Sequence, residues 1–160
     1  MKDKFKFAFM DVASRFAKLS SAKRAQVGAI IVKDDRIISI GYNGMPSGWS
    51  NECEYDEVTT EFKSEVNIYL ETHLTRTKQE VIHAESNAIS KVAQSSESSK
   101  GASLFCTHMP CINCAKLIYQ SGITHVYVKD DYIAAVGVGR EFLEQCDITL
   151  EFVNDQIESV

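Results

Sequence analysis

The sequence lacks any apolar run long enough to cross a membrane. A spanning helix needs about 20 predominantly apolar residues, whereas the longest apolar runs are short segments such as residues 27–32. The N-terminus interleaves charged residues with Phe5, Phe7 and Phe9, which is not the pattern of a secretory signal. We therefore expect a cytoplasmic protein with no membrane partner.

The sequence also lacks an excess of positive charge. Its formal net charge is -5 at pH 7, which argues against a broad face for binding nucleic acid. We expect no nucleic-acid partner, although a local basic pocket for one small phosphate is compatible with this balance.

A disulfide framework is the third absence. The chain has five cysteines, and an odd number with two in a C-x-x-C motif fits thiols or metal ligands better. No internal repeat and no linker interrupts the 160 residues. The length and the 44% hydrophobic fraction fit one globular domain that spans residues 1–160.

The hydrophobic pattern predicts an α/β fold. Asp34 and Asp35 separate two β-branched runs, which is typical of a hairpin. The predicted helices cover residues 4–19, 83–92, 111–121 and 136–146, and the predicted strands cover residues 27–32, 36–42, 102–107, 124–128 and 148–153. This order predicts a three-layer α-β-α sandwich around a five-stranded mixed sheet. Residues 43–51 form a turn-rich loop, and within the polar residues 51–79 we expect only a short helix between 61 and 70.

Two short motifs carry the chemistry. His83 and Glu85 form H-x-E, and Pro110 precedes Cys111 and Cys114 in P-C-x-x-C. This pair of motifs is the signature of zinc deaminases. One imidazole and two thiolates can hold Zn²⁺ and leave a fourth position for water.

Local geometry supports a shared site. Cys111 and Cys114 are three residues apart, so on a helix they lie on one face. Both fall in the first helical turn, where free N–H groups and the helix dipole favour thiolates. His83 is also expected at a helix start. Glu85 is then the candidate acid/base, which accepts a proton from water and returns protons to the ring nitrogen and the leaving ammonia.

Structural zinc and a redox dithiol are the alternatives. A structural site needs a fourth protein ligand; the candidates are Cys53, Cys106, His73, His108 and His125. Cys106 lies in an apolar strand, where a buried core thiol is commoner. The conjunction of H-x-E with P-C-x-x-C favours a catalytic zinc.

Four segments together resemble the deoxycytidylate (dCMP) deaminases, a branch of the zinc-dependent cytidine and deoxycytidylate deaminase family. They cover residues 26–29, 41–48, 83–89 and 110–116, and the resemblance extends over about residues 5–130. The loop G-Y-N-G-x-P-x-G separates this branch from other zinc deaminases. The resemblance implies a cytidine-deaminase-like fold and hydrolysis of dCMP to dUMP and ammonia, which supplies dUMP for thymidylate synthesis. It also implies a homohexamer that is activated by dCTP, with Mg²⁺ as a companion ion, and inhibited by dTTP.

The same resemblance assigns the zinc ligands to His83, Cys111 and Cys114 and the proton shuttle to Glu85. It implies that Asn43 hydrogen-bonds the deoxyribose or base, and that Tyr132 stacks on the pyrimidine. For Tyr132 the alternative is a partly buried loop tyrosine.

The phosphate and the effector are assigned to further residues. Lys23, Arg24 and Gln26 precede a strand whose start could border the pocket, so they are the phosphate candidates; a solvated basic turn is the alternative. Gly44, Met45 and Gly48 resemble the effector-binding part of the family.

Two features depart from the regulated relatives. Ile133 stands where some of them have a basic residue. Cys53 and His73 could belong to a second, structural zinc, but no full ligand set is evident and we expect one zinc per chain. A deaminase for a free nucleoside, a free base or tRNA remains the alternative within the class, and a non-catalytic zinc-stabilised module the alternative outside it.

Overall fold

The computed structural model describes residues 1–153; residues 154–160 of the predicted domain lie outside the described part. The helices are α1 (Asp3–Ala17), α2 (Ala84–Ala93), α3 (Ile112–Gln120) and α4 (Arg140–Gln145). The strands are β1 (Gly28–Lys33), β2 (Arg36–Tyr42), β3 (Glu54–Lys63), β4 (Ile68–Thr77), β5 (Ser103–His108), β6 (His125–Asp130) and β7 (Thr149–Phe152).

Five strands form the predicted mixed sheet, in the order β2-β1-β5-β6-β7. β1 is antiparallel to both β2 and β5, whereas β5, β6 and β7 are parallel. Asp34 and Asp35 turn the β1–β2 hairpin with positive φ angles of 50° and 56°, as a type I′ turn requires. The predicted fold class is therefore confirmed.

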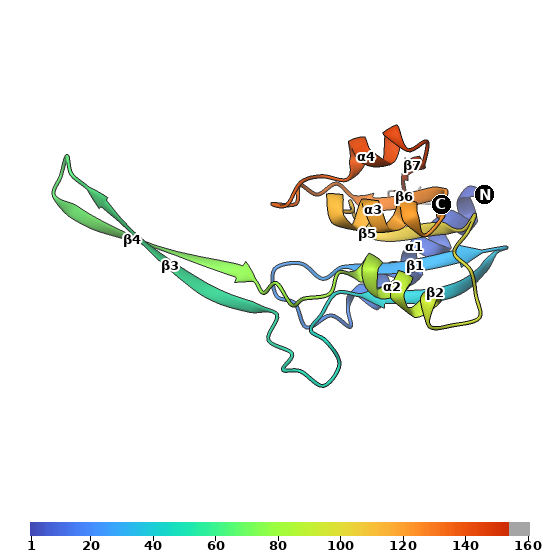
Figure 1. Cartoon of the computed structure of the whole chain (residues 1–160), viewed down its shortest axis with the longest axis horizontal. Coiled ribbons are helices and arrows are strands. Elements are labelled where there is room, and N and C mark those ends of the chain that lie inside the picture. The colour runs from blue at the N-terminus through green and yellow to red at the C-terminus, as the bar shows by residue number, and fades with distance from the viewer. Residues whose placement is uncertain (154–160) are drawn as a thin grey trace, which may run out of the picture.

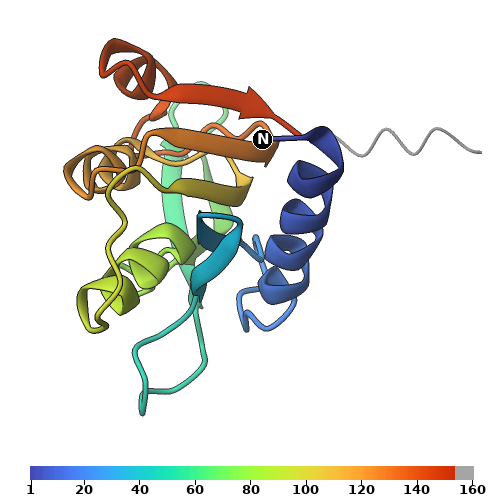
Figure 2. The ribbon, with the colours of Figure 1, turned by 90° about the vertical axis from the view of Figure 1, so that its right-hand side faces the viewer.

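Helices cover both faces of this sheet (Figures 1 and 2), with α1 on one face and α2, α3 and α4 on the other. Alternate residues of each central strand enter opposite cores. In β5, Phe105 packs under α1 with Ile30 and Tyr127, while Leu104 and Cys106 pack under the other helices. The near-continuous apolar strands of the sequence follow from this two-sided burial.

The last predicted helix begins later than expected. We predicted a start at residue 136, but α4 starts at Arg140. Gly137 has a φ of +106°, which a helix cannot accommodate, and Val138 instead pairs with Cys111 in an isolated antiparallel bridge. The segment before α4 is thus held against the start of α3. The other predicted helices and strands of the sheet agree with the structure to within one or two residues.

The short helix expected between residues 61 and 70 is wrong. This region instead forms a long antiparallel hairpin, β3–β4, with Glu54 opposite Thr77 and Lys63 opposite Ile68. Figure 1 shows the hairpin projecting from the sheet and its helices as a two-stranded arm. Its β-branched and aromatic residues favour strands, and Asn67 at the tip takes a positive φ of 52°.

In residues 1–153 no helix combines the length and the apolar character needed to cross a membrane.

Candidate functional site

The structure brings His83, Cys111 and Cys114 together, as the motifs predicted. His83 is the N-cap residue of α2 and Cys111 is the N-cap residue of α3, while Cys114 lies in the first turn of α3. The potential ligand atoms of the three residues lie within 4.8 Å of one another. Two helix N-termini therefore converge on one point, and their exposed N–H groups favour bound negative charge there.

The spacing of the three side chains fits a zinc ion. The Nδ1 atom of His83 is 3.6 Å from Sγ of Cys111 and 3.4 Å from Sγ of Cys114. With Zn–N near 2.0–2.1 Å and Zn–S near 2.3 Å, tetrahedral geometry separates N and S by about 3.5 Å. The donor set also matches the three protein ligands of a catalytic zinc site.

The pKa values of the two cysteine thiols are shifted in opposite directions. The hydrogen bond between them lowers the pKa of Cys111 to about 4, and the same bond raises the pKa of Cys114. The hydrogen bond to Cys111 also raises the pKa of His83. These shifts favour ionisation of Cys111 over Cys114 next to the imidazole.

Glu85 lies in the first turn of α2, two residues after His83, and is 4% exposed. Burial raises the pKa of its carboxyl, and hydrogen bonds from its own backbone amide and from Cys114 oppose that shift. The rise favours the protonated form and brings the pKa of the carboxyl closer to the operating pH. A group with such a pKa can both accept and donate a proton. A buried carboxyl beside three metal-binding side chains is suited to proton transfer.

Cys106 is a neighbour of the site for which the sequence favoured the role of a buried core thiol. Its thiol is fully buried in β5, and burial raises its pKa well above the ordinary thiol value. The thiol is also close enough to the Glu85 carboxyl for the charge there to raise the pKa of the thiol. The alternation of β5 could have revealed this contact, because Cys106 faces the same side of the sheet as α2.

Two backbone bridges fix the loops around the site. Gly44 pairs with Ile82, directly before His83, through two hydrogen bonds of 2.9 and 3.1 Å. On the other side, the bridge between Val138 and Cys111 holds the loop that precedes α4. The loops that follow β2 and β6 therefore both pass beside metal-binding residues.

Asn43 is buried, and its side chain is already engaged. Its Oδ1 accepts a hydrogen bond from the amide of Val27 at 2.8 Å, and its Nδ2 donates to the carbonyl of Ala25 at 2.8 Å. The Oδ1 atom can still accept one more hydrogen bond, and the Nδ2 atom can still donate one more.

The residues expected at the effector lie along the same loop. Met45 packs against the small apolar cluster of Ala22, Cys53 and Val81. Gly48 has a φ of +84° in a turn closed by the hydrogen bond from the Trp49 amide to Pro46. Of the three residues, Gly44 is the one that pairs with Ile82, the residue before His83.

Two of the three phosphate candidates, Lys23 and Arg24, meet the base of the β3–β4 arm. The backbone amides of Lys23 and Arg24 donate to the carboxylate of Glu54, and the Arg24 guanidinium donates to Thr77 at 3.0 Å. Gln26 donates to the carbonyl of Ser20. In this arrangement Arg24 and Gln26 hold the loop before β1.

Tyr132 follows β6 and is partly exposed. Its ring lies edge-on to His108, with 5.9 Å between the ring centroids. His108 ends β5, three residues before Cys111. The ring of Tyr132 is therefore close to the metal-binding end of the sheet.

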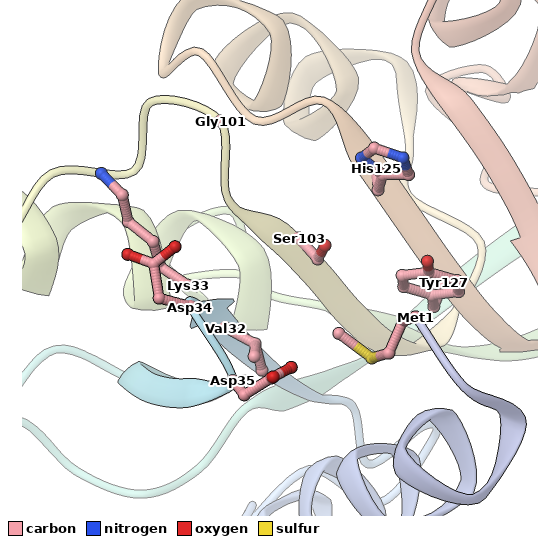
Figure 3. Close-up of a pocket in the computed structure, with 9 residues that line it drawn as sticks. All are labelled: Met1, Val32, Lys33, Asp34, Asp35, Gly101, Ser103, His125 and Tyr127. Atoms are coloured by element: carbon pink, nitrogen blue, oxygen red, sulfur yellow. The ribbon is translucent and has the colours of Figure 1, made fainter.

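The hollow drawn in Figure 3 lies elsewhere. Its lining includes Val32 at the end of β1, Ser103 at the start of β5 and His125 at the start of β6. Because β5 runs from Ser103 towards Cys111, this hollow and the metal-binding group lie at opposite ends of the sheet. It is not part of the candidate site.

The fold and the site together define a class of protein. A mixed α/β sheet that places H-x-E and P-C-x-x-C at two converging helix N-termini is the arrangement expected of a zinc-dependent hydrolytic deaminase.

Comparison with known proteins identifies the family. The family described as "Cytidine and deoxycytidylate deaminase zinc-binding region" matches residues 3–130. The chain belongs to this family.

Individual relatives agree with this assignment. ComE operon protein 2 of Bacillus subtilis is 36% identical over 91% of this chain and 69% of its own length. The deoxycytidylate deaminase of Homo sapiens is 40% identical over 78% of this chain, which spans 64% of that protein. The crystal structure of the cyanophage S-TIM5 dCMP deaminase in complex with dCMP and dUMP is similar, with a TM-score of 0.78, 38% identity and coverage of 95% of this chain and 98% of that one.

Proposed function

We propose that the protein hydrolyses dCMP to dUMP and ammonia. The observation that carries this proposal is the convergence of His83, Cys111 and Cys114 beside the buried carboxyl of Glu85. The similarity to dCMP deaminases, one of them solved with dCMP and dUMP, supports this choice of substrate. The product would supply thymidylate synthesis.

We propose one zinc ion per chain, held by His83, Cys111 and Cys114. When bound, the ion would supply a Lewis acid that makes water a stronger nucleophile at neutral pH. Glu85 accepts a proton from the water as its oxygen bonds to C4 of the cytosine ring. The carboxyl passes this proton to the ring nitrogen N3. It then takes the second proton from the new hydroxyl on C4 and passes it to the amino group, which leaves as ammonia when the C4–N bond breaks.

The remaining substrate contacts are assigned as follows. Asn43 uses its two remaining hydrogen-bonding positions for the deoxyribose or base, and Tyr132 lies against the pyrimidine. Lys23, Arg24 and Gln26 are the phosphate residues. The exposed Lys23 side chain is the best suited of these, because Arg24 and Gln26 already hydrogen-bond within the chain.

Regulation and assembly follow the family resemblance. We propose that dCTP with Mg²⁺ activates the enzyme at Gly44, Met45 and Gly48, that dTTP inhibits it, and that the chain forms a homohexamer. The pairing of Gly44 with Ile82 would link the effector loop to His83. The basic residue of some regulated relatives is absent at Ile133, which would change the strength or the route of the effector response.

We also propose a single catalytic domain and a cytoplasmic location, where reducing conditions would keep the five unpaired thiols in the reduced state.

A kinetic panel tests the substrate and the regulation together. Initial rates are measured with dCMP, deoxycytidine and CMP, each with and without dCTP. The proposal predicts that kcat/KM is highest for dCMP and that dCTP reduces the sigmoidicity of the dCMP curve. Faster turnover of deoxycytidine would reject the phosphate requirement, and identical curves would reject activation by dCTP.

A further inference from the structure

The β3–β4 arm exposes apolar side chains on a ribbon that stands apart from the rest of the fold (Figure 1). Tyr69 is 72% exposed, Val58 53% and Phe62 49%. An isolated two-stranded hairpin is marginally stable in water, and clustered exposed apolar residues mark interaction surfaces. The arm therefore requires a partner surface.

The two faces of the arm differ in charge. Because directly paired residues share a face, the register puts Val58, Phe62 and Tyr69 on one face together with Asp56 and Glu71. We call this the acidic face. The rings of Phe62 and Tyr69 are in contact there, with their centroids 4.9 Å apart.

The opposite face balances its own charges. Arg76 hydrogen-bonds to Glu57 at 2.8 Å, and Lys63 lies 3.3 Å from Glu61. Lys63 and Arg76 are the two Lys/Arg residues of the arm, so both lie on this opposite face. Asp56 and Glu71 are left with no Lys or Arg on the acidic face, where the nearby base is His73, 4.0 Å from Glu71.

The N-terminal part of the chain carries the opposite charge. Residues 54–77 contain six Asp/Glu and two Lys/Arg, a formal charge of -4, whereas residues 1–24 contain seven Lys/Arg and two Asp/Glu, a formal charge of +5. Arg15 and Lys18 lie on the exposed side of α1 and its end, and within residues 1–153 the structure shows no ion pair for either. Leu19, beside them, is 58% exposed.

We propose that the arm is an assembly device whose acidic face docks on the α1 region of a second copy of this chain. Asp56 and Glu71 then meet Arg15 and Lys18, and Phe62 and Tyr69 cover Leu19. Each copy has one arm and one α1, so two copies can make the contact reciprocally, and a reciprocal contact closes a two-fold pair. This goes beyond the proposed hexamer by assigning one of its contacts, and it does not depend on catalytic activity.

Charge distinguishes this contact from a pairing of two arms. Two arms would bring two segments of charge -4 together, and like charges opposed across an interface cost affinity. The arm and the α1 region have opposite charges and both expose apolar groups. The structure therefore favours contact between arm and body over contact between arms.

Reversal of charge tests the contact by sedimentation velocity across a range of concentrations. The variant Asp56→Lys/Glu71→Lys and the variant Arg15→Glu/Lys18→Glu should each raise the dissociation constant of the pair at least about tenfold. The control Glu141→Lys/Glu144→Lys makes the same change in net charge as Asp56→Lys/Glu71→Lys, on exposed residues of α4 across the sheet from α1, and should leave the constant unchanged.

Restoration completes the experiment. The four changes combined in one chain should recover assembly, which also shows that the altered arm still folds. Mixing the two defective variants should likewise recover assembly, because each supplies the charge that the other lacks.

Normal assembly of Arg15→Glu/Lys18→Glu would overturn the proposal in favour of pairing between arms or another partner. A four-change chain that assembles no better than either defective variant would also overturn it. Activity towards dCMP is assayed separately, so failure of this contact and failure of the proposed reaction are distinguishable.

Discussion

At the scale of single residues, burial decides what Glu85 can do. Its carboxyl lies two positions after His83, a spacing that points away from a shared site within a regular helix. Here His83 is the N-cap with extended backbone, with φ -71° and ψ 152°, and Glu85 is inside the first turn. The change of backbone between them lets both side chains approach one point.

Replacement of Glu85 by Gln should abolish most turnover while zinc is retained. The amide keeps the shape of the side chain but cannot carry protons, and general acid–base catalysis contributes about 10²–10⁴-fold. Turnover of dCMP and metal content per chain are the measurements. Glu80→Gln, an exposed residue before His83, is the matched control. Undiminished turnover in Glu85→Gln would remove Glu85 from the chemistry.

His108 should make stability sensitive to mild acid. Burial lowers the pKa of its imidazole below the ordinary value of 6.5, with Asp130 acting in the opposite direction. The unfolded chain therefore binds a proton that the folded chain resists, so the stability present above pH 6.5 is lost as the pH falls towards the lower folded pKa.

His108→Gln should consequently lose less stability between pH 7.5 and 5.5 than the parent, as measured from urea midpoints at a fixed zinc concentration. His125→Gln is the control, since His125 makes the same 3.0 Å contact with its preceding threonine in a more exposed setting. An unchanged pH dependence in His108→Gln would show that this imidazole does not control acid stability.

At the scale of elements, close packing of β2 against α2 sets the position of the site. A Cβ atom on Gly41 would overlap the carbonyl oxygen of Ala84 and approach the backbone of Ala88. Ala84 is the first residue of α2, between His83 and Glu85. The absence of a side chain on Gly41 therefore lets the start of α2 pack closely against β2.

Gly41→Ala should destabilise the fold by about 1–3 kcal/mol through overpacking and should lower both zinc retention and activity, because α2 must move. The free energy of unfolding and the zinc content measure the two effects. Gly44→Ala is the comparison for stability, since a Cβ there meets no atom within 4 Å. Equal stability of Gly41→Ala and the parent would show that α2 can shift without cost.

The arm is the element that the sequence pattern concealed. A half-buried strand shows apolar residues at every second position, but Ile68, Tyr69 and Leu70 are consecutive, so they supply both faces of β4. Within residues 1–153, no hydrophobic core covers one face of this hairpin and not the other. The periodic signal was therefore weak, whereas the strands of the buried sheet were predicted to within one or two residues.

At the scale of the whole molecule, the metal-binding residues join two parts of the chain. His83 and the two cysteines are 28 and 31 residues apart in sequence, and they hold the starts of α2 and α3 together. A ligand that binds the folded chain and not the unfolded chain stabilises the fold.

Removal of zinc should therefore lower the unfolding temperature. At a zinc concentration a hundredfold above the dissociation constant, the expected stabilisation is about 2.7 kcal/mol. Thermal unfolding with zinc and with a chelator measures the shift, and His83→Ala should show a much smaller one. An equal zinc-dependent shift in His83→Ala would place the stabilising ion elsewhere.

The sequence by itself determined the chemistry and the sheet, because both depend on short-range patterns: H-x-E, P-C-x-x-C and apolar runs of the lengths that strands and helices need. Only the tertiary structure decided that Glu85 is buried beside Cys106, that Arg24 and Gln26 hydrogen-bond within the chain, and that residues 54–77 form a projecting arm. These features depend on contacts between residues distant in sequence, and on surfaces that no local periodicity records.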